Sequence, residues 1–295
     1  MSGTAEPRRA AVLGHPIGHS LSPTLHGAAY RLLGVAIEYS RRAIDLEALP
    51  QFLAGEGAED GWVGWSVTMP LKAAMVDHMT SISDRVDALG VLNTVVHGPD
   101  GLHGENTDVD GIVTALGDAG LRKDMVPGAD GFGIIGAGAT ATASLAAAAE
   151  LGFSEVRIYA RSPGQVAALQ PIGEALGVRC QARHLEDLRR DLSGDELSAV
   201  VSTLPPGAAD TLASQVPLLT RPLPLLDVAY DPWPSMLAQA WERAGGHVIS
   251  GLVMLLHQAV AQVELFTAHL SRPAGVLSPD QHEAMVERMR AAVGL

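Results

Sequence analysis

Residues 131–149 decide the fold of this chain: they read GFGIIGAGATATASLAAAA and carry no charged side chain. A short β-like run, Gly133 to Ile135, leads into a glycine-rich turn, and an alanine-rich helix pattern follows. Gly, Ala and Thr make the stretch too weakly apolar for a membrane span. A buried strand, turn and helix explain it better, and this order is how a nucleotide-binding βα unit begins.

The turn has the pattern GxGxxA, a variant of the dinucleotide-binding loop. The first glycine permits a tight turn, the second lets backbone amides approach a pyrophosphate, and the final alanine keeps helix and strand close. Unpaired N–H groups and the helix dipole favour an anion there. A tight βα turn of any α/β domain is the alternative reading. We expect a cofactor to contact Gly136, Ala137, Gly138, Ala139, Thr140 and Ala141.

The end of the next expected strand, Val156 to Ala160, indicates which dinucleotide binds. An NAD site usually places Asp or Glu there for the ribose 2′-hydroxyl, but the residues that follow are Arg161 and Ser162. A guanidinium suits a 2′-phosphate and can stack on adenine, and the serine hydroxyl can donate to the phosphate. The sequence therefore favours NADP(H) over NAD(H), with an ordinary solvated arginine as the alternative.

Composition sets the class of protein. The chain has 295 residues, which suggests two domains, and 47% hydrophobic with 18% charged residues is a globular composition. Twenty basic against 33 acidic residues give a net charge of −13, which argues against nucleic-acid or membrane partners. A small anionic substrate must then be held by a few placed donors.

The single cysteine, Cys180, excludes an intrachain disulfide and a cysteine zinc site, and we expect no metal. One cysteine fits a reducing cytosol, and residues 1–9 lack the apolar region of a signal peptide. We therefore expect a cytoplasmic protein, monomeric or homodimeric.

Short β-like and helix-like runs alternate almost throughout, which predicts an α/β fold with largely parallel sheets. In the first half we expect a strand over 9–13, a helix capped by Ser22, a strand over 62–68, a helix opened by Pro70, and a hairpin around residues 98–101. The domain boundary is expected at the polar stretch 121–130 or slightly before it, since a helix beginning at Asp108 can be the connector.

Several polar residues in the first half suggest substrate chemistry. Lys72 would lie in the first turn of the helix from Pro70, where the dipole disfavours its proton, as suits a lysine that exchanges one. Asp108 precedes a helix and could equally be an N-cap. Asn93 and Thr94 interrupt an apolar strand, at its possible C-terminal part, where open α/β sheets bind ligands.

Two further groups of polar residues fit a substrate site. Ser20 and Ser22 put hydroxyls at a helix N-terminus, which makes a small carboxylate site, although Ser22 could simply be a cap. Gln258 lies in an apolar helix pattern and points either to solvent or into a cleft.

Together these segments resemble the shikimate dehydrogenase family from about residue 9 to residue 270. The motifs occur in family order and spacing. They are GHPIGHSLSP at 14–23 with His26, SVTMPLK at 66–72, GVLNT at 90–94, NTD at 106–108 with Gly111, DVAYDP at 227–232, and GLVML at 251–255 with Gln258 and Ala259.

The resemblance implies reversible, NADP-linked interconversion of shikimate and 3-dehydroshikimate. It implies an N-terminal open α/β substrate-binding domain, residues 1–111 with 251–295 packing back, a Rossmann-type NADP-binding domain over 112–250, and a cleft between them. By this resemblance Lys72 and Asp108 form the catalytic pair. The substrate contacts it implies are Ser20, Ser22, Thr68, Asn93, Tyr230 and Gln258, and Gly251 and Met254 would face the nicotinamide.

Three departures bear on this interpretation. Gly27 follows His26 where the family usually has Asn, Ala139 replaces the last glycine of the turn, and Gln165 stands where a second basic residue often supports NADP. Alternatives are a quinate/shikimate or aminoshikimate dehydrogenase and a non-catalytic ligand-sensing homologue. A methyltransferase would explain the glycine-rich turn but not Lys72, Asn93 and Asp108.

Overall fold

The computed structural model describes residues 8–122, 131–268, 270 and 277–295. The chain divides into two compact units: a first unit, Met1–Thr107 with Gln258–Leu295, and a second unit, Asp108–His257. The first unit ends at Thr107, four residues before the expected limit at 111, and resumes at Gln258, seven residues after the expected limit at 251. The polar stretch proposed as a boundary, 121–130, lies mostly outside the described residues.

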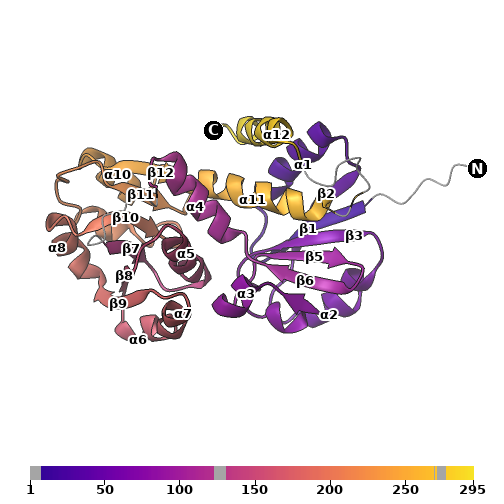
Figure 1. The fold of residues 1–295 in the computed structure, drawn as a ribbon, viewed down its shortest axis with the longest axis horizontal. Helices are drawn as coiled ribbons and strands as arrows, with labels where there is room; N and C mark the ends of the chain where they lie inside the picture. The colour runs from indigo at the N-terminus through magenta and orange to yellow at the C-terminus, as the bar shows by residue number, and fades with distance from the viewer. Residues whose placement is uncertain (1–7, 123–130, 269, 271–276) are drawn as a thin grey trace, which may run out of the picture. The chain divides into compact units, whose positions relative to one another are not determined.

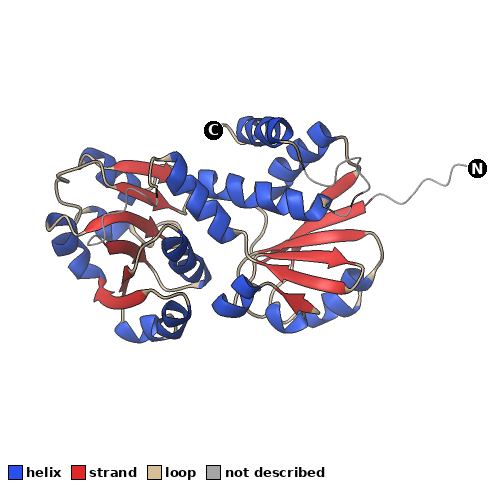
Figure 2. Ribbon diagram, viewed as in Figure 1, coloured by secondary structure: helices blue, strands red, loops and turns tan. Residues whose placement is uncertain are grey.

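The first unit is built on a mixed six-stranded sheet (Figure 2). Its order is β2-β1-β3-β5-β6-β4. β1 pairs parallel with β2 and β3, whereas β5 runs antiparallel to both β3 and β6. The strands are β1 (Arg8–Gly14), β2 (Ile37–Ala43), β3 (Trp62–Val67), β4 (Ser81–Ile82), β5 (Thr94–Gly98) and β6 (Gly101–Glu105).

Apolar side chains cover both faces of this sheet. Successive residues of β1 point to opposite faces, so Ala10 packs with Phe266 and Ala11 packs with Phe52. In β3 the pairing with β1 shifts by one residue at Val63, so Val63 joins the Phe266 face and Trp65 the Phe52 face. The helices are α1 (Ser22–Leu33), α2 (Leu49–Ala54), α3 (Asp84–Leu89), the later part of α11 (Gly251–Thr267) and α12 (Pro279–Ala292), with short 3₁₀ turns at Glu56–Ala58 and Val76–His78. Helix α12 lies against α1 and shows that the C-terminal tail ends in a helix (Figure 1).

The expected helix from Pro70 does not form. Residues 69–75 make separate turns, and only the 3₁₀ turn Val76–His78 follows. The reason lies in the Lys72 carbonyl, which would accept an intrahelical bond but instead accepts the Leu92 N–H at 3.0 Å. Leu71 and Met75 are fully buried, so the core also fixes this path. The helix-dipole argument for Lys72 is therefore wrong.

The expected Ser22 cap of α1 does not form. Gly34 ends α1 in the left-handed conformation, with φ 64°. The N-cap of α1 is Leu21 rather than Ser22, and no side chain caps it. Before α2, which begins at Leu49, the Asp45 carboxylate accepts the amides of Glu47 and Ala48.

The second unit contains a parallel sheet of order β12-β11-β10-β7-β8-β9. The chain starts in the middle, at β7, runs outward to β9, then returns beyond β7 and runs outward to β12. This is the doubly wound Rossmann order, which places a ligand crevice where the order reverses, between β7 and β10. The strands are β7 (Gly131–Ile135), β8 (Glu155–Ala160), β9 (Arg179–His184), β10 (Leu197–Ser202), β11 (Pro224–Asp227) and β12 (His247–Ser250).

Helices surround this sheet (Figure 1). They are α4 (Asp108–Asp118), α5 (Ala139–Glu150), α6 (Pro163–Ala167), α7 (Gln170–Ala175), α8 (Leu188–Ser193), α9 (Asp210–Ala213) and α10 (Met236–Arg243). No helix within the described ranges is long and apolar enough to cross a membrane.

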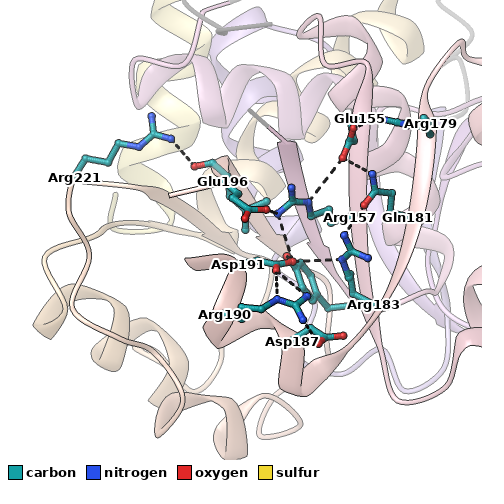
Figure 3. A network of polar contacts seen from close by, with 12 residues as sticks. Glu155, Arg157, Arg179, Gln181, Arg183, Asp187, Arg190, Asp191, Glu196 and Arg221 are labelled. Atoms are coloured by element: carbon teal, nitrogen blue, oxygen red, sulfur yellow. Dashed lines mark hydrogen bonds and ion pairs between the residues drawn. The ribbon is translucent and has the colours of Figure 1, made fainter. Parts of the chain in front are cut away.

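A buried polar network connects β8 and β9 to α8 (Figure 3). Asp191 is 2% exposed and accepts the Tyr159 hydroxyl at 2.8 Å. Arg157 is also buried and lies 3.5 Å from Asp191 and 2.5 Å from Glu196. A buried charge is tolerated only when paired, so Asp191 holds the end of β8, where the expected cofactor residues follow.

We expect Asp191→Ala to lower the free energy of unfolding by about 3–5 kcal/mol, because it leaves the buried Tyr159 hydroxyl without its acceptor and removes the buried carboxylate beside Arg157. Urea denaturation measures this. Glu59→Ala, which removes an exposed ion pair with Arg9, serves as the control and should cost less than about 1 kcal/mol. Equal losses in the two variants would contradict the structural role of the network.

Candidate active site

Four polar segments of the first unit gather at one edge of its sheet. The carboxyl ends of β1, β3 and β6 meet there, because these strands run in the same direction. β5 runs the opposite way, so its start lies at this edge. Asn93 and Thr94 stand at that start, which corrects the expectation that they lie in the C-terminal part of a strand.

The loops after β1 and β3 are locked together. Thr68 N–H donates to Leu13 O at 2.9 Å, and His15 N–H donates to Met69 O at 2.9 Å. A Cβ at Gly14 would lie 2.4 Å from Thr68 Cγ2, so only glycine allows this approach. The side chains of Thr68 and Lys72 are both half-buried. The Lys72 carbonyl accepts the N–H of Leu92, the residue that precedes Asn93 in the chain.

Asn93 is the centre of the polar groups at this edge and is 1% exposed. Its Oδ1 accepts the Thr107 N–H at 2.7 Å and the Thr94 hydroxyl at 2.8 Å. Its Nδ2 donates to Thr107 Oγ1 at 3.0 Å and to Gln258 Oε1 at 3.3 Å. Gln258 therefore points inward against Asn93 rather than to solvent, and Asp108 directly follows Thr107 in the chain.

The two serines are joined to each other and to a neighbouring arginine. Ser20 Oγ donates to Ser22 Oγ at 3.2 Å, and Ser22 is buried. Arg41 on β2 donates twice to the Ser20 carbonyl, at 2.5 and 3.1 Å. Hydroxyls beside a guanidinium suit a carboxylate, and Arg41 brings a positive charge next to the two serines.

Behind this edge lies a second layer of buried polar side chains. The His26 ring is fully buried, stacks on Tyr39 at 4.0 Å between centroids, and contacts Gln262 Oε1 at 3.2 Å. Burial lowers the pKa of His26 to about 3, so the ring is neutral at pH 7. Burial also raises the pKa of Tyr39, whose hydroxyl donates to Ser66 at 2.6 Å.

The glycine-rich turn of the second unit has the conformation that its sequence predicts. Gly136 has φ +114°, and a Cβ there would lie 2.4 Å from Thr203 Oγ1. Gly138 is the N-cap of α5, and a Cβ there would meet nothing within 4 Å. The turn is thus tight at the first glycine and open at the second, as a pyrophosphate cradle requires.

Arg161 and Ser162 lie beside this turn. They follow β8, and Gly136 N–H donates to Tyr159 O at 2.9 Å, which fixes the turn against the end of that strand. Both side chains are exposed, and Ser162 makes no capping bond to α6. The guanidinium and the hydroxyl are therefore both accessible at the end of β8.

The remaining expected residues also belong to the second unit. Gly251 begins α11 and packs so closely that a Cβ would lie 2.2 Å from Val228 O, so helix–strand packing already requires this glycine. Met254 is buried, and burial raises the pKa of the half-buried Tyr230. The structure therefore brings Ser20, Ser22, Thr68, Lys72, Asn93 and Gln258 into one unit, and Asp108, Tyr230 and the expected cofactor contacts into the other.

The sequence analysis missed Arg41, Tyr39, Ser66 and Gln262. Only Gln262 carried a usable signal, since it lies four residues after Gln258 and hence on the same helix face. Tyr39, Arg41 and Ser66 lie on strands β2 and β3, and the sequence did not indicate which strands would be neighbours in the sheet. No group of three or more His, Cys, Asp or Glu side chains that could hold a metal ion occurs in the parts of the chain that the structure describes.

Comparison with known proteins gives consistent matches. A family model described as the shikimate dehydrogenase substrate binding domain matches residues 12–95. The NADP⁺-dependent shikimate dehydrogenase of Methylobacterium radiotolerans is 33% identical, over 87% of this chain and 90% of that protein. The enzyme of the same name from Thermus thermophilus is 34% identical, over 97% of this chain and 99% of that protein.

Solved structures extend the likeness to the fold. Shikimate dehydrogenase of Mycobacterium tuberculosis is 39% identical with a TM-score of 0.80, over 97% of this chain and 100% of that one. The Thermus thermophilus enzyme, solved with NADP(H) and shikimate, is 30% identical with a TM-score of 0.75, over 97% and 99%. The Listeria monocytogenes enzyme, solved with shikimate and NAD, is 26% identical with a TM-score of 0.78, over 99% and 98%.

We expect the buried His26 to make stability depend on pH. The folded state holds its pKa at about 3 against an ordinary 6.5, so the unfolded chain binds a proton that the folded chain excludes. The free energy of unfolding therefore falls as pH drops below about 6.5, by up to about 1.4 kcal/mol per pH unit from this group.

Urea denaturation between pH 7 and pH 4.5 tests this. His26→Gln should have a flatter pH dependence than the wild type, whereas His247→Gln, at an exposed position of β12, should keep the wild-type slope. Parallel curves for the wild type and His26→Gln would rule out the buried neutral ring.

Proposed function

Because the chain belongs to the shikimate dehydrogenase family, we propose that it reversibly reduces 3-dehydroshikimate to shikimate with NADPH. The observation that carries this proposal is the convergence of Ser20, Ser22, Thr68, Lys72, Asn93 and Gln258 in the first unit, at the ends of β1 and β3 and the start of β5. These groups match a small cyclic acid: serine hydroxyls for its carboxylate, amides for its hydroxyls, and an amine for its ketone.

We assign substrate binding to the first unit and NADP(H) binding to the second. The turn at residues 136–141 fits the pyrophosphate, since Gly138 leaves open space where a side chain would stand. Arg161 and Ser162 fit the 2′-phosphate, and Gly251 and Met254 are assigned to the nicotinamide end. NADPH, when bound, supplies the hydride.

Lys72 provides the proton chemistry of the mechanism. In the direction of reduction its ammonium donates a proton to the ketone oxygen as that oxygen becomes a hydroxyl, and in reverse the neutral amine accepts the hydroxyl proton. Asp108, which directly follows Thr107 in the chain, is assigned to orient the same oxygen. Asn93, Thr68 and Gln258 position the ring, and Ser20 and Ser22 bind the carboxylate. For Tyr230, in the second unit, the family resemblance implies a substrate contact.

Absorbance at 340 nm tests the proposal directly. We expect oxidation of shikimate with NADP⁺ to exceed that with NAD⁺, and oxidation of quinate or aminoshikimate to be weaker. Faster turnover of quinate than of shikimate would identify the chain as a quinate/shikimate dehydrogenase. Faster turnover with NAD⁺ would show that Arg161, with Gln165 in place of a second basic residue, does not give a preference for NADP⁺. Binding of shikimate without any absorbance change would support the ligand-sensing alternative.

A cytoplasmic location and a monomeric or homodimeric state are further parts of the proposal. The first is supported by the lone Cys180, a free thiol that suits a reducing compartment.

We expect Lys72→Ala to lower kcat for shikimate by about 10²–10⁴-fold, the usual contribution of general acid–base catalysis. Thr68→Val is the matched control at the same edge: it removes one substrate contact, so it should raise KM and leave kcat nearly intact. If Lys72→Ala raises only KM and keeps kcat within about threefold, Lys72 binds the substrate and does not transfer the proton.

We expect Arg161→Gln to raise KM for NADP⁺ by about 10–100-fold, because a hydrogen bond to a charged group contributes about 1.5–3 kcal/mol. KM for NAD⁺, which lacks the 2′-phosphate, should not change. Arg179→Gln, an exposed arginine at the opposite end of the neighbouring strand, should alter neither value. An equal loss with both cofactors would mean that Arg161 does not read the 2′-phosphate.

A further inference from the structure

Two neighbouring arginines of β2 are held in different ways. Successive strand residues point to opposite faces of a sheet. Arg42 forms an ion pair with Glu56 at 2.7 Å and donates to Ser40 Oγ at 2.8 Å. Arg41 instead donates from Nε and Nη2 to the main-chain carbonyl of Ser20, at 3.1 and 2.5 Å. A carboxylate therefore balances the charge of Arg42, whereas a neutral oxygen holds Arg41.

The charge of Arg41 stays unbalanced. Its side chain is exposed, and within the described residues its guanidinium makes no ion pair and no hydrogen bond besides those to Ser20. A carbonyl orients a guanidinium without neutralising it, so the full positive charge remains, and Nη1 keeps both hydrogens for another partner. Arginines that do contact a carboxylate are Arg9, Arg42, Arg157, Arg179, Arg183, Arg190 and Arg221.

The carbonyl that Arg41 holds belongs to a serine assigned to the substrate. The Ser20 N–H donates to Ile17 O at 3.1 Å, so Ser20 is fixed through its main chain on both sides. Covalent geometry keeps a serine carbonyl oxygen within about 5 Å of its own hydroxyl oxygen. The Arg41 charge therefore lies within roughly a Debye length of the Ser20 hydroxyl, where solvent ions do not screen it completely.

The field of Arg41 also reaches the buried hydroxyl of Tyr39. Burial raises the pKa of Tyr39, whereas a hydrogen bond with Ser22 and the Arg41 charge oppose that rise. Ser22 Oγ in turn accepts from Ser20 Oγ at 3.2 Å. Arg41 thus acts electrostatically on the same small group of hydroxyls that is assigned to the substrate carboxylate.

Hydroxyl groups alone do not distinguish a carboxylate from a neutral carbonyl, because both accept the same hydrogen bonds, whereas a nearby cation stabilises only the charged group. We propose that Arg41 is a specificity-determining residue of the substrate site: its charge selects an ionised carboxylate over a neutral oxygen at Ser20 and Ser22. This rests on the function proposed above. A local cation also offsets the repulsion that a chain of net charge −13 exerts on an anion.

The variant Arg41→Gln, assayed with shikimate and with its uncharged methyl ester, tests this selection. The ester keeps the ring and the hydroxyl that is oxidised. We expect kcat/KM for shikimate to fall by about 5–10-fold, the effect of one partly screened charge at this range. kcat/KM for the ester should stay within about twofold of wild type, so the acid-to-ester ratio falls, and KM for NADP⁺ should not change.

Two control variants separate charge from position. Arg42→Gln removes the neighbouring arginine, whose charge Glu56 already balances, and should leave the acid-to-ester ratio unchanged. Arg41→Lys keeps the charge but cannot form the two-pronged bond to Ser20, so it should keep most of the ratio. Raising NaCl from about 50 to about 500 mM should lower the ratio of the wild type and leave that of Arg41→Gln nearly constant.

An equal loss with acid and ester in Arg41→Gln would mean that Arg41 only holds the loop, and it would overturn the proposal, as would an acid-to-ester ratio that stays within about twofold of wild type. Ligand-observed NMR gives the affinities of acid and ester without turnover. A wild-type chain that binds shikimate but does not oxidise it would refute the proposed function, while the affinity ratios of wild type and Arg41→Gln still decide the role of Arg41. Binding of neither compound would overturn both.

Discussion

A single hydrogen bond, from the main-chain N–H of Thr107 to the side-chain Oδ1 of Asn93 at 2.7 Å, organises the substrate side of this protein. It joins the end of β6 to the start of β5, and both groups are almost completely buried. A buried backbone N–H without a partner is costly, so the Asn93 amide is held in one orientation. Everything that contacts Asn93, including Gln258 and the Thr94 hydroxyl, takes its direction from that constraint.

The cofactor side depends on a different constraint, the close approach of the glycine turn to the end of strand β8. Gly136 adopts a φ that side-chain-bearing residues avoid, and its amide is bonded to Tyr159 at the end of the neighbouring strand. Tyr159 in turn is anchored by Asp191 in the buried network of Figure 3. The glycine turn and the exposed Arg161 are thus fixed at the end of a strand, so that little ordering is needed when an anion binds.

Local sequence signals predicted the elements that local physics controls. Alternating β-like and helix-like runs predicted strands β7 and β8, and the GxGxxA turn predicted its own position between β7 and α5. The turn that begins at Pro70 was predicted wrongly, since the Lys72 carbonyl is bonded to Leu92, twenty residues further along the chain. The contacts of Gln258 and Gln262 likewise needed the fold, because their partners lie more than 160 residues away.

The sequence by itself determined the two α/β parts, the glycine turn and the residue types able to bind an acid and a phosphate, because turn chemistry and hydrophobic periodicity act within a few residues. Tertiary structure alone decided that β5 runs antiparallel to β3, and this reversal brings Asn93 to the edge where β1 and β3 end. It also decided the directions of the buried amides, since these depend on donors and acceptors supplied by strands and helices far apart in the chain.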